Sequence, residues 1–166
     1  MSMLRASVQD WQWRTWASDT RQILVGPWRS EVGFETLYWL PWLAAWRKRY
    51  GIPESRCVAI TRGGAGAWYG MAKTVELYDY VPADKLRQAM LRDAQRSGSI
   101  KQQALTTWEA KLLHLIAEDL GLRRYHVLHP SAMYRGLAPW WNGTIGLTEA
   151  LGALDFTAPL VVPPVP

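Results

Sequence analysis

Short, continuous runs of apolar residues alternate along the chain with longer stretches in which apolar residues recur at helical spacing. The runs are Ile23–Val25, Cys57–Thr61, Val75–Tyr78 and Tyr125–Leu128. An apolar run without polar alternation is typical of a strand that is buried on both faces of a parallel sheet. The spacing between the first two runs suits a β-α-β unit. We therefore predict a strand at each of these four runs.

The intervening stretches predict helices. Their expected ranges are Ser30 to Arg49, Ala83 to Arg96, Thr106 to Leu120 and Met133 to Ala138. Ser30 is the expected N-cap of the first helix, and Pro41 should kink that helix or split it in two. Thr106 and Glu109 match a capping box at the start of the third helix.

Strands that alternate with helices in this way predict an α/β fold, specifically a Rossmann-like three-layer domain with a mostly parallel sheet. The chain has 166 residues, of which 49% are hydrophobic, so one domain is expected, over residues 21–142. Residues 1–20 are polar, contain three tryptophans and show no clean period, which indicates a leader that can pack onto the domain. Residues 143–166 are predicted to be a weakly structured segment and a proline-rich linker, Pro159 to Pro166, to a missing second domain.

Charge and cysteine content narrow the classes of function. The chain carries 19 basic and 14 acidic residues, a net charge of +5, which favours anionic partners. A codon bias toward arginine, alanine and tryptophan would explain the same excess. The charges form no dense run, so a nucleic-acid partner is not expected. No apolar stretch is long enough for a transmembrane segment, and no secretory signal is present, so with a single cysteine, Cys57, we predict a cytoplasmic location.

Three turns should meet at one edge of the predicted sheet. They are Gly26–Gly33, Arg62–Gly66 and His129–Ser131. In open parallel sheets, ligands bind at the carboxyl ends of the strands, near a switch in strand order. The sequence therefore predicts the functional site where these turns converge.

The first turn supplies an acid between two glycines. Gly26 lets the chain bend off the strand, and Gly33 removes a side chain where a ligand or a strand could approach. Glu31 at the helix start can accept hydrogen bonds from hydroxyls or act as a general base. The alternative is that Glu31 only complements the helix dipole and that Gly33 serves helix packing.

The other two turns supply a guanidinium and an imidazole. Arg62 is a candidate clamp for phosphate or carboxylate, assisted by the N–H groups of Gly63 and Gly64. The alternatives are a surface ion pair for the arginine and a flexible turn for the glycines. His129 is a candidate base near neutral pH, or else a strand-end residue that is hydrogen-bonded to the backbone.

Tryptophans in turns are the remaining candidates. Trp28 and Trp68 could stack on sugar rings, although tryptophans in such places more often cap the edge of a domain. Neither metal-ligand spacing nor a zinc-type cluster occurs in the sequence, so no metal site is predicted.

The segments ILVGPWRSEVGFETLYWLPWLAAWRKRYG, CVAITRGGAGAWYG and HVLHPSAMYR together resemble the N-terminal domain of bacterial GT-B-type glycosyltransferase-like proteins. The resemblance covers roughly Ile23 to Trp141. The matching residues are Gly26, Pro27, Trp28, Ser30, Glu31, Gly33, Glu35, Tyr38, Trp39, Pro41, Arg62, Gly63, Gly64, Trp68, Tyr69, His129, Pro130 and Tyr134.

This resemblance implies one half of a two-domain enzyme, in which the N-terminal domain holds the acceptor and the C-terminal domain holds a nucleotide-sugar. Glu31 or His129 would then be the catalytic base. The implied substrate-binding residues are Gly26, Trp28, Gly33, Arg62, Gly63, Gly64, Trp68 and Tyr134. The nucleotide-sugar is a co-substrate, and no other cofactor is implied. The donor half is expected from a second domain or a partner chain, so this chain should be inactive alone. The alternative is a non-catalytic Rossmann-like module that binds a ligand or a protein.

Overall fold

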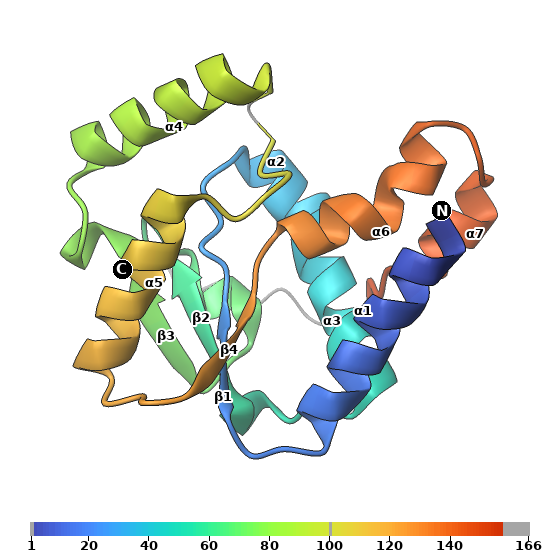
Figure 1. Cartoon of the computed structure of the whole chain (residues 1–166), viewed down its shortest axis with the longest axis horizontal. Coiled ribbons are helices and arrows are strands. Elements are labelled where there is room, and N and C mark those ends of the chain that lie inside the picture. Colours follow the sequence, from blue (N-terminus) through green and yellow to red (C-terminus); the bar gives the residue numbers. More distant parts are fainter. Residues whose placement is uncertain (1, 100, 158–166) are drawn as a thin grey trace.

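A four-stranded parallel sheet forms the centre of the computed structural model, which describes residues 2–99 and 101–157 (Figure 1). The strands are β1 (Gln22–Val25), β2 (Cys57–Thr61), β3 (Lys73–Glu76) and β4 (Tyr125–Leu128). Their order is β3-β2-β1-β4, and each neighbouring pair is parallel. The predicted α/β class and parallel sheet are confirmed. The bounds of the third strand differ from the predicted run Val75–Tyr78. The strand begins at Lys73, and a 3₁₀ segment follows it at Leu77.

Helices cover both faces of the sheet. The helices are α1 (Ser2–Ala17), α2 (Val32–Phe34), α3 (Leu40–Tyr50), α4 (Ala83–Ser97), α5 (Thr107–Asp119), α6 (Ser131–Trp141) and α7 (Leu147–Leu151). Figure 1 shows α4 and α5 on one side of the sheet and α1, α3 and α6 on the other. Successive strand residues point to opposite faces, so Ile23 and Val25 pack toward α3 while Leu24 packs toward α5. The predicted three-layer arrangement follows from these two apolar clusters.

Helix boundaries follow the sequence signals in most places. The Thr106–Glu109 capping box is present, with Glu109 N–H donating to Thr106 Oγ1 at 3.2 Å and Thr106 N–H donating to Glu109 Oε2 at 2.8 Å. The helix around Pro41 is divided, because a π-helical turn at Glu35–Trp39 separates α2 from α3. The predicted N-cap at Ser30 is wrong. The capping position is Glu31, without a side-chain hydrogen bond.

Residues 2–17 form a helix, although the sequence shows no clean helical period there. Trp16 is buried in the core, and its ring stacks on His126 with centroids 4.5 Å apart. Trp13, one helical turn earlier, packs edge-on against Trp42 and Trp46. These aromatic side chains thus pack α1 onto the side of the sheet that α3 covers.

The C-terminal part of the described chain also contacts the domain. After α7, the Asp155 N–H donates to the Pro41 carbonyl at 2.9 Å. The predicted proline-rich linker, Pro159 to Pro166, lies outside the described residues. None of the described helices is both long enough and apolar enough to cross a membrane.

Candidate functional site

The strand order changes direction at β1, which has β2 on one side and β4 on the other. The turns that follow β1 and β4 therefore flank the switch point, where parallel sheets bind ligands. The Gly26 N–H donates to the Leu128 carbonyl at 2.9 Å and holds the ends of these two strands together. The structure thus brings the first and third predicted turns to one edge of the sheet.

Gly26 is required by the backbone of the first turn. Its φ is +107°, and a Cβ there would lie 2.8 Å from the Ile60 carbonyl oxygen. The Gly26–Pro27 peptide is cis. Gly26 is also buried within the fold, so its part in the site is to shape the turn.

Trp28 belongs to the core. It is fully buried between Trp39 and Tyr134, with ring centroids 6.1 and 6.3 Å away, and its Nε1 donates to the Glu31 carbonyl at 3.1 Å. No face of this ring is open to a sugar, so the prediction that Trp28 stacks on a sugar ring is wrong. Trp68 is half-buried and packs against the same core cluster.

Glu31 and Gly33 face solvent at the edge of the sheet. Both are exposed, and among the described residues the Glu31 side chain forms no hydrogen bond. A Cβ at Gly33 would meet no protein atom within 4 Å, so this glycine is not needed for helix packing. The carboxylate is therefore free to bind a ligand from solvent.

Arg62 connects the second turn to the first. Its Nη2 donates to the Ser30 carbonyl, next to Glu31, and its Nε is buried without a partner among the described residues. The neighbouring N–H groups are occupied. Gly63 and Gly64 each donate to a different oxygen of Glu76 at 3.0 Å. In this arrangement the chain's own carboxylate, rather than a ligand, takes the anion position that the sequence predicts for these glycines.

Glu35 is a polar residue of this edge that the sequence-based choice of site residues missed. It is 1% exposed and accepts a hydrogen bond from the Tyr69 hydroxyl at 2.6 Å. Burial raises the pKa of Glu35, and the Tyr69 hydrogen bond and the nearby Arg62 offset part of that rise. One feature of the sequence points to Glu35 as a site residue. It lies four residues after Glu31, at the start of an otherwise apolar helical stretch.

His129 has both ring nitrogens engaged inside the protein. Nδ1 accepts from the Ser131 N–H at 3.2 Å, and Nε2 lies 3.1 Å from Glu109 Oε1. A backbone N–H can only donate, so Nδ1 is the acceptor and Nε2 carries the proton that Glu109 accepts. His129 therefore has no free nitrogen to take a proton from a substrate. The alternative prediction, a strand-end histidine that is hydrogen-bonded to the backbone, fits the structure better than the role of base.

A buried ionic network extends from that histidine to the first turn. Glu109 is fully buried and also accepts from Arg29 Nε at 2.7 Å and from Gln102 Nε2 at 3.0 Å. Burial alone would raise the pKa of Glu109, but the hydrogen bonds from His129 and Arg29 outweigh it and hold that pKa well below its ordinary value. The Gln102 amide also donates to the Pro27 carbonyl at 2.8 Å. Gln102 thereby fixes the segment before α5 to the turn after β1.

That anchored segment forms one wall of a cleft of about 510 Å³ beside α6. The cleft is lined by Lys101, Gln103, Tyr134, Arg135, Ala138, Trp141 and Asn142. Tyr134, which the family resemblance marks as a substrate contact, is 5% exposed. Its ring stacks on Trp28 of the first turn, so the cleft adjoins the switch point.

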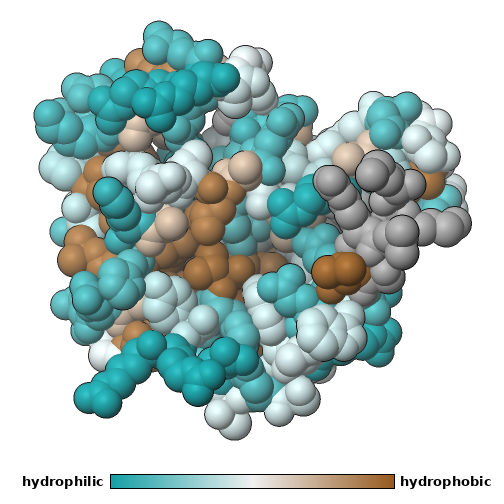
Figure 2. Space-filling model, viewed as in Figure 1, coloured by the Kyte–Doolittle hydropathy of each residue, from teal (hydrophilic) through white to brown (hydrophobic). Residues whose placement is uncertain are grey.

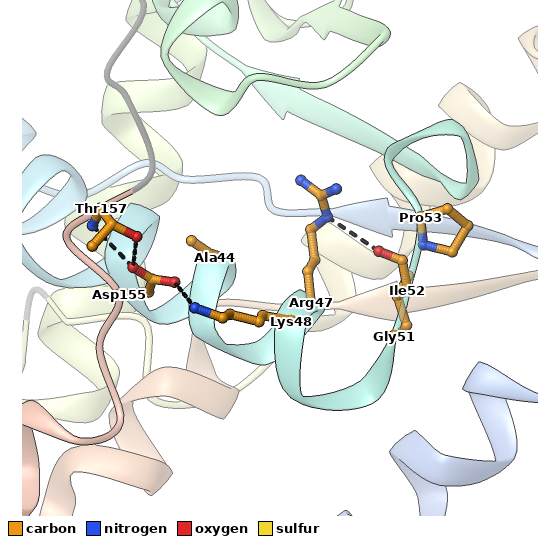
Figure 3. A pocket seen from close by; sticks show the side chains of 8 residues that line it. All are labelled: Ala44, Arg47, Lys48, Gly51, Ile52, Pro53, Asp155 and Thr157. Carbon is orange, nitrogen blue, oxygen red and sulfur yellow. Dashed lines mark hydrogen bonds and ion pairs between the residues drawn. The ribbon is translucent and has the colours of Figure 1, made fainter.

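Two of the other hollows are less suited to a ligand. At the C-terminal end of α3, a pocket is lined by Asp155, which pairs with Lys48 at 3.3 Å, and by Arg47, which donates to the Ile52 carbonyl (Figure 3). These polar groups already have partners. Figure 2 shows hydrophobic side chains in a hollow over β4, where a groove includes Leu105 and Val127. This groove lies along β4, the edge strand, and neither Glu31 nor Arg62 lines it.

Comparisons with protein-family models, curated proteins and solved structures find no match to this chain. The geometry alone therefore defines the candidate site. It consists of the exposed Glu31, the adjoining Arg62 turn and the cleft at Tyr134.

Proposed function

We propose that this chain is the acceptor-side domain of a glycosyltransferase that transfers a sugar from a nucleotide-sugar to a hydroxyl of a glycan or another acceptor. The observation that carries the proposal is the exposed Glu31 carboxylate at the switch point of a parallel sheet, beside an open cleft that contains Tyr134 and Trp141. The family resemblance of the three turns supports the same assignment.

In this function, Glu31 accepts the proton of the acceptor hydroxyl. The hydroxyl oxygen then forms a bond to the anomeric carbon of the donor sugar as the bond between that carbon and the diphosphate oxygen breaks. The nucleoside diphosphate leaves with the bonding electron pair. A second domain or a partner chain supplies the nucleotide-sugar, and Arg62 holds the Ser30 carbonyl so that the turn bearing Glu31 keeps its shape.

The deciding experiment measures sugar transfer from labelled nucleotide-sugars to oligosaccharide acceptors, using the longest protein that contains this domain. Glu31→Gln should lower kcat/KM by about 100-fold or more, the usual contribution of a general base. Because the Glu31 side chain makes no internal hydrogen bond, the variant should fold normally. An unchanged kcat/KM in Glu31→Gln would remove this residue from the mechanism, and the absence of any transfer would contradict the proposed activity.

A non-catalytic binding module is the second candidate. Internal hydrogen bonds already occupy the imidazole of His129 and the N–H groups of Gly63 and Gly64, which the sequence predicts to act on a substrate. Fewer predicted catalytic groups are therefore available, and this favours a binding role. Saturable glycan binding by this chain, with no transfer under any donor, would support this candidate over the transferase.

A further inference from the structure

The cleft beside α6 carries uncompensated positive charge. Lys101 and Arg135 both line it, and no acidic residue does. Within residues 2–99 and 101–157, neither of these two side chains forms an ion pair with an acidic group. Lys101 instead lies over the rings of Phe34 and Trp141, 5.2 and 5.1 Å from their centroids. Arg135 donates to the Ser131 hydroxyl at 3.0 Å.

Tyr134, which lines the same cleft as these cations, carries a buried hydroxyl. The Tyr134 OH has no hydrogen-bond partner among the described residues, although the residue is 95% buried and lines the cleft. The Ser30 side chain lies nearby, but no hydrogen bond of normal geometry joins the two groups. A buried polar group left unpaired is costly, so a ligand that supplies the missing partner would be favoured.

The cleft also contains an accessible aromatic ring. Trp141 is 36% exposed and forms part of the wall, and Gln103 and Asn142 line the same space. An indole face suits the apolar face of a sugar ring, and amides suit ring hydroxyls. Neutral recognition groups and two cations therefore lie in one site.

We propose that this cleft binds an acidic sugar, a hexose bearing a carboxylate or a phosphate, with Arg135 and Lys101 holding the anionic group and Tyr134 hydrogen-bonding a hydroxyl. The inference rests on the proposed function, because it names the class of acceptor presented to Glu31. Guanidinium groups bind carboxylate and phosphate with paired, charge-assisted hydrogen bonds, so either substituent satisfies the same chemistry.

The test is an NMR titration of the full chain with glucuronic acid, glucose 6-phosphate, glucose, glucuronamide and inorganic phosphate. Glucuronamide keeps the size of glucuronic acid and lacks its charge. We expect at least one of the two acidic sugars to bind at least about tenfold more tightly than glucose and glucuronamide, which corresponds to ~1.4 kcal/mol. That difference should shrink as salt is raised. The two acidic sugars distinguish a carboxylate source from a phosphate source.

Three variants assign the contacts. Arg135→Gln should remove most of the preference for the charged sugar, whereas Arg87→Gln, an exposed arginine on α4, should leave it unchanged. Tyr134→Phe deletes only the unpaired hydroxyl, so it should weaken sugar binding several-fold while thermal stability is kept or increased. A purely structural tyrosine would not separate binding from stability in this way.

Two results would overturn the inference and leave the proposed function standing. One is equal binding of neutral and acidic sugars that Arg135→Gln does not alter, and the other is inorganic phosphate binding as tightly as glucose 6-phosphate. Conversely, Arg135-dependent binding of an acidic sugar, together with transfer that does not depend on Glu31, would overturn the proposed function and keep the inference.

Discussion

Gly26 and Gly33 lie at the two ends of the segment after β1 but meet opposite constraints. Gly26 has a positive φ and faces the Ile60 carbonyl, whereas Gly33 lies in helix α2 with open space around it. A side chain at the first position strains the backbone and forces a contact. At the second position it meets only solvent or a bound ligand.

Gly26→Ala should therefore lower the free energy of unfolding by about 2 kcal/mol or more, the range for a strained, over-tight backbone position. Gly33→Ala, the matched control, should leave stability unchanged or raise it by up to about 1 kcal/mol, because alanine is the better helix former. Urea unfolding of both variants, followed by circular dichroism, measures the two effects. Equal stability of the variants would contradict the assigned geometry of this turn.

For single residues, the sequence predicts the place in the fold better than it predicts the contacts of the side chain. Glycines and a guanidinium at strand ends are visible in the sequence, and the structure places Arg62 against the first turn as expected. The sequence does not show that Glu76, thirteen positions after Gly63, occupies the glycine N–H groups. Nor does it show that Trp28 turns inward, since a turn tryptophan can point either way.

Among the helices, α5 depends on the Glu109 carboxylate, whose two oxygens make different sets of contacts. Glu109 closes the capping box with Thr106 through Oε2 and accepts Arg29, Gln102 and His129 through Oε1. The capping box is a local pattern and is visible in the sequence. The ionic network joins residues up to 80 positions apart, so no local pattern predicts it.

Glu109→Gln should lower stability at pH 7 by about 3 kcal/mol or more, because it leaves Arg29 in a buried site with less opposing charge. Since the folded pKa of Glu109 lies below its ordinary value, the wild-type stabilisation is complete at neutral pH and declines as pH falls below about 5. The variant should therefore show a flatter decline in stability between neutral and acidic pH.

Urea unfolding across this pH range measures the slope. Glu118→Gln, an exposed position on the same helix, is the control and should behave like the wild type. Asp19 keeps part of the slope in every variant, because hydrogen bonds from Arg21 and His126 outweigh the effect of burial and lower its pKa as well. An unaltered slope in Glu109→Gln would show that the network does not bind the charged carboxylate preferentially.

Helix α1 carries one buried and one exposed tryptophan. Trp16 is 7% exposed within the core, whereas Trp11 on the same helix is 69% exposed. Trp16→Ala should cost about 3–5 kcal/mol, as expected for truncating a buried aromatic residue. Trp11→Ala should change stability by less than about 0.5 kcal/mol. Differential scanning calorimetry compares them, and a small effect at Trp16 would mean that α1 is not packed onto the sheet.

At the scale of the whole molecule, the sheet could be predicted because its strands are continuous apolar runs buried on both faces. The cleft could not be predicted, since it depends on Gln102, which holds the Lys101 segment to Pro27 from 75 positions away. Nothing in the sequence distinguishes Arg135 from other helical arginines. Only the fold places it in one cleft with Lys101 and Tyr134.

The single cysteine reports on the stability of the whole fold. Cys57 begins β2, is 1% exposed and lies in the same apolar cluster as Trp16. Burial raises the pKa of its thiol to about 11, so little reactive thiolate exists at neutral pH, and the surrounding side chains block access to it.

Reaction of native protein with an aromatic disulfide reagent should therefore be slow and should occur only when the fold opens. If opening and reclosing are fast compared with labelling, the rate follows the population of the open form. Each ~1.4 kcal/mol lost from the free energy of opening then raises the labelling rate about tenfold. Trp16→Ala should label far faster than the wild type, whereas Trp11→Ala should match it. Rapid labelling of the folded wild-type chain would contradict the burial of Cys57, because only local exposure of the thiol could explain it.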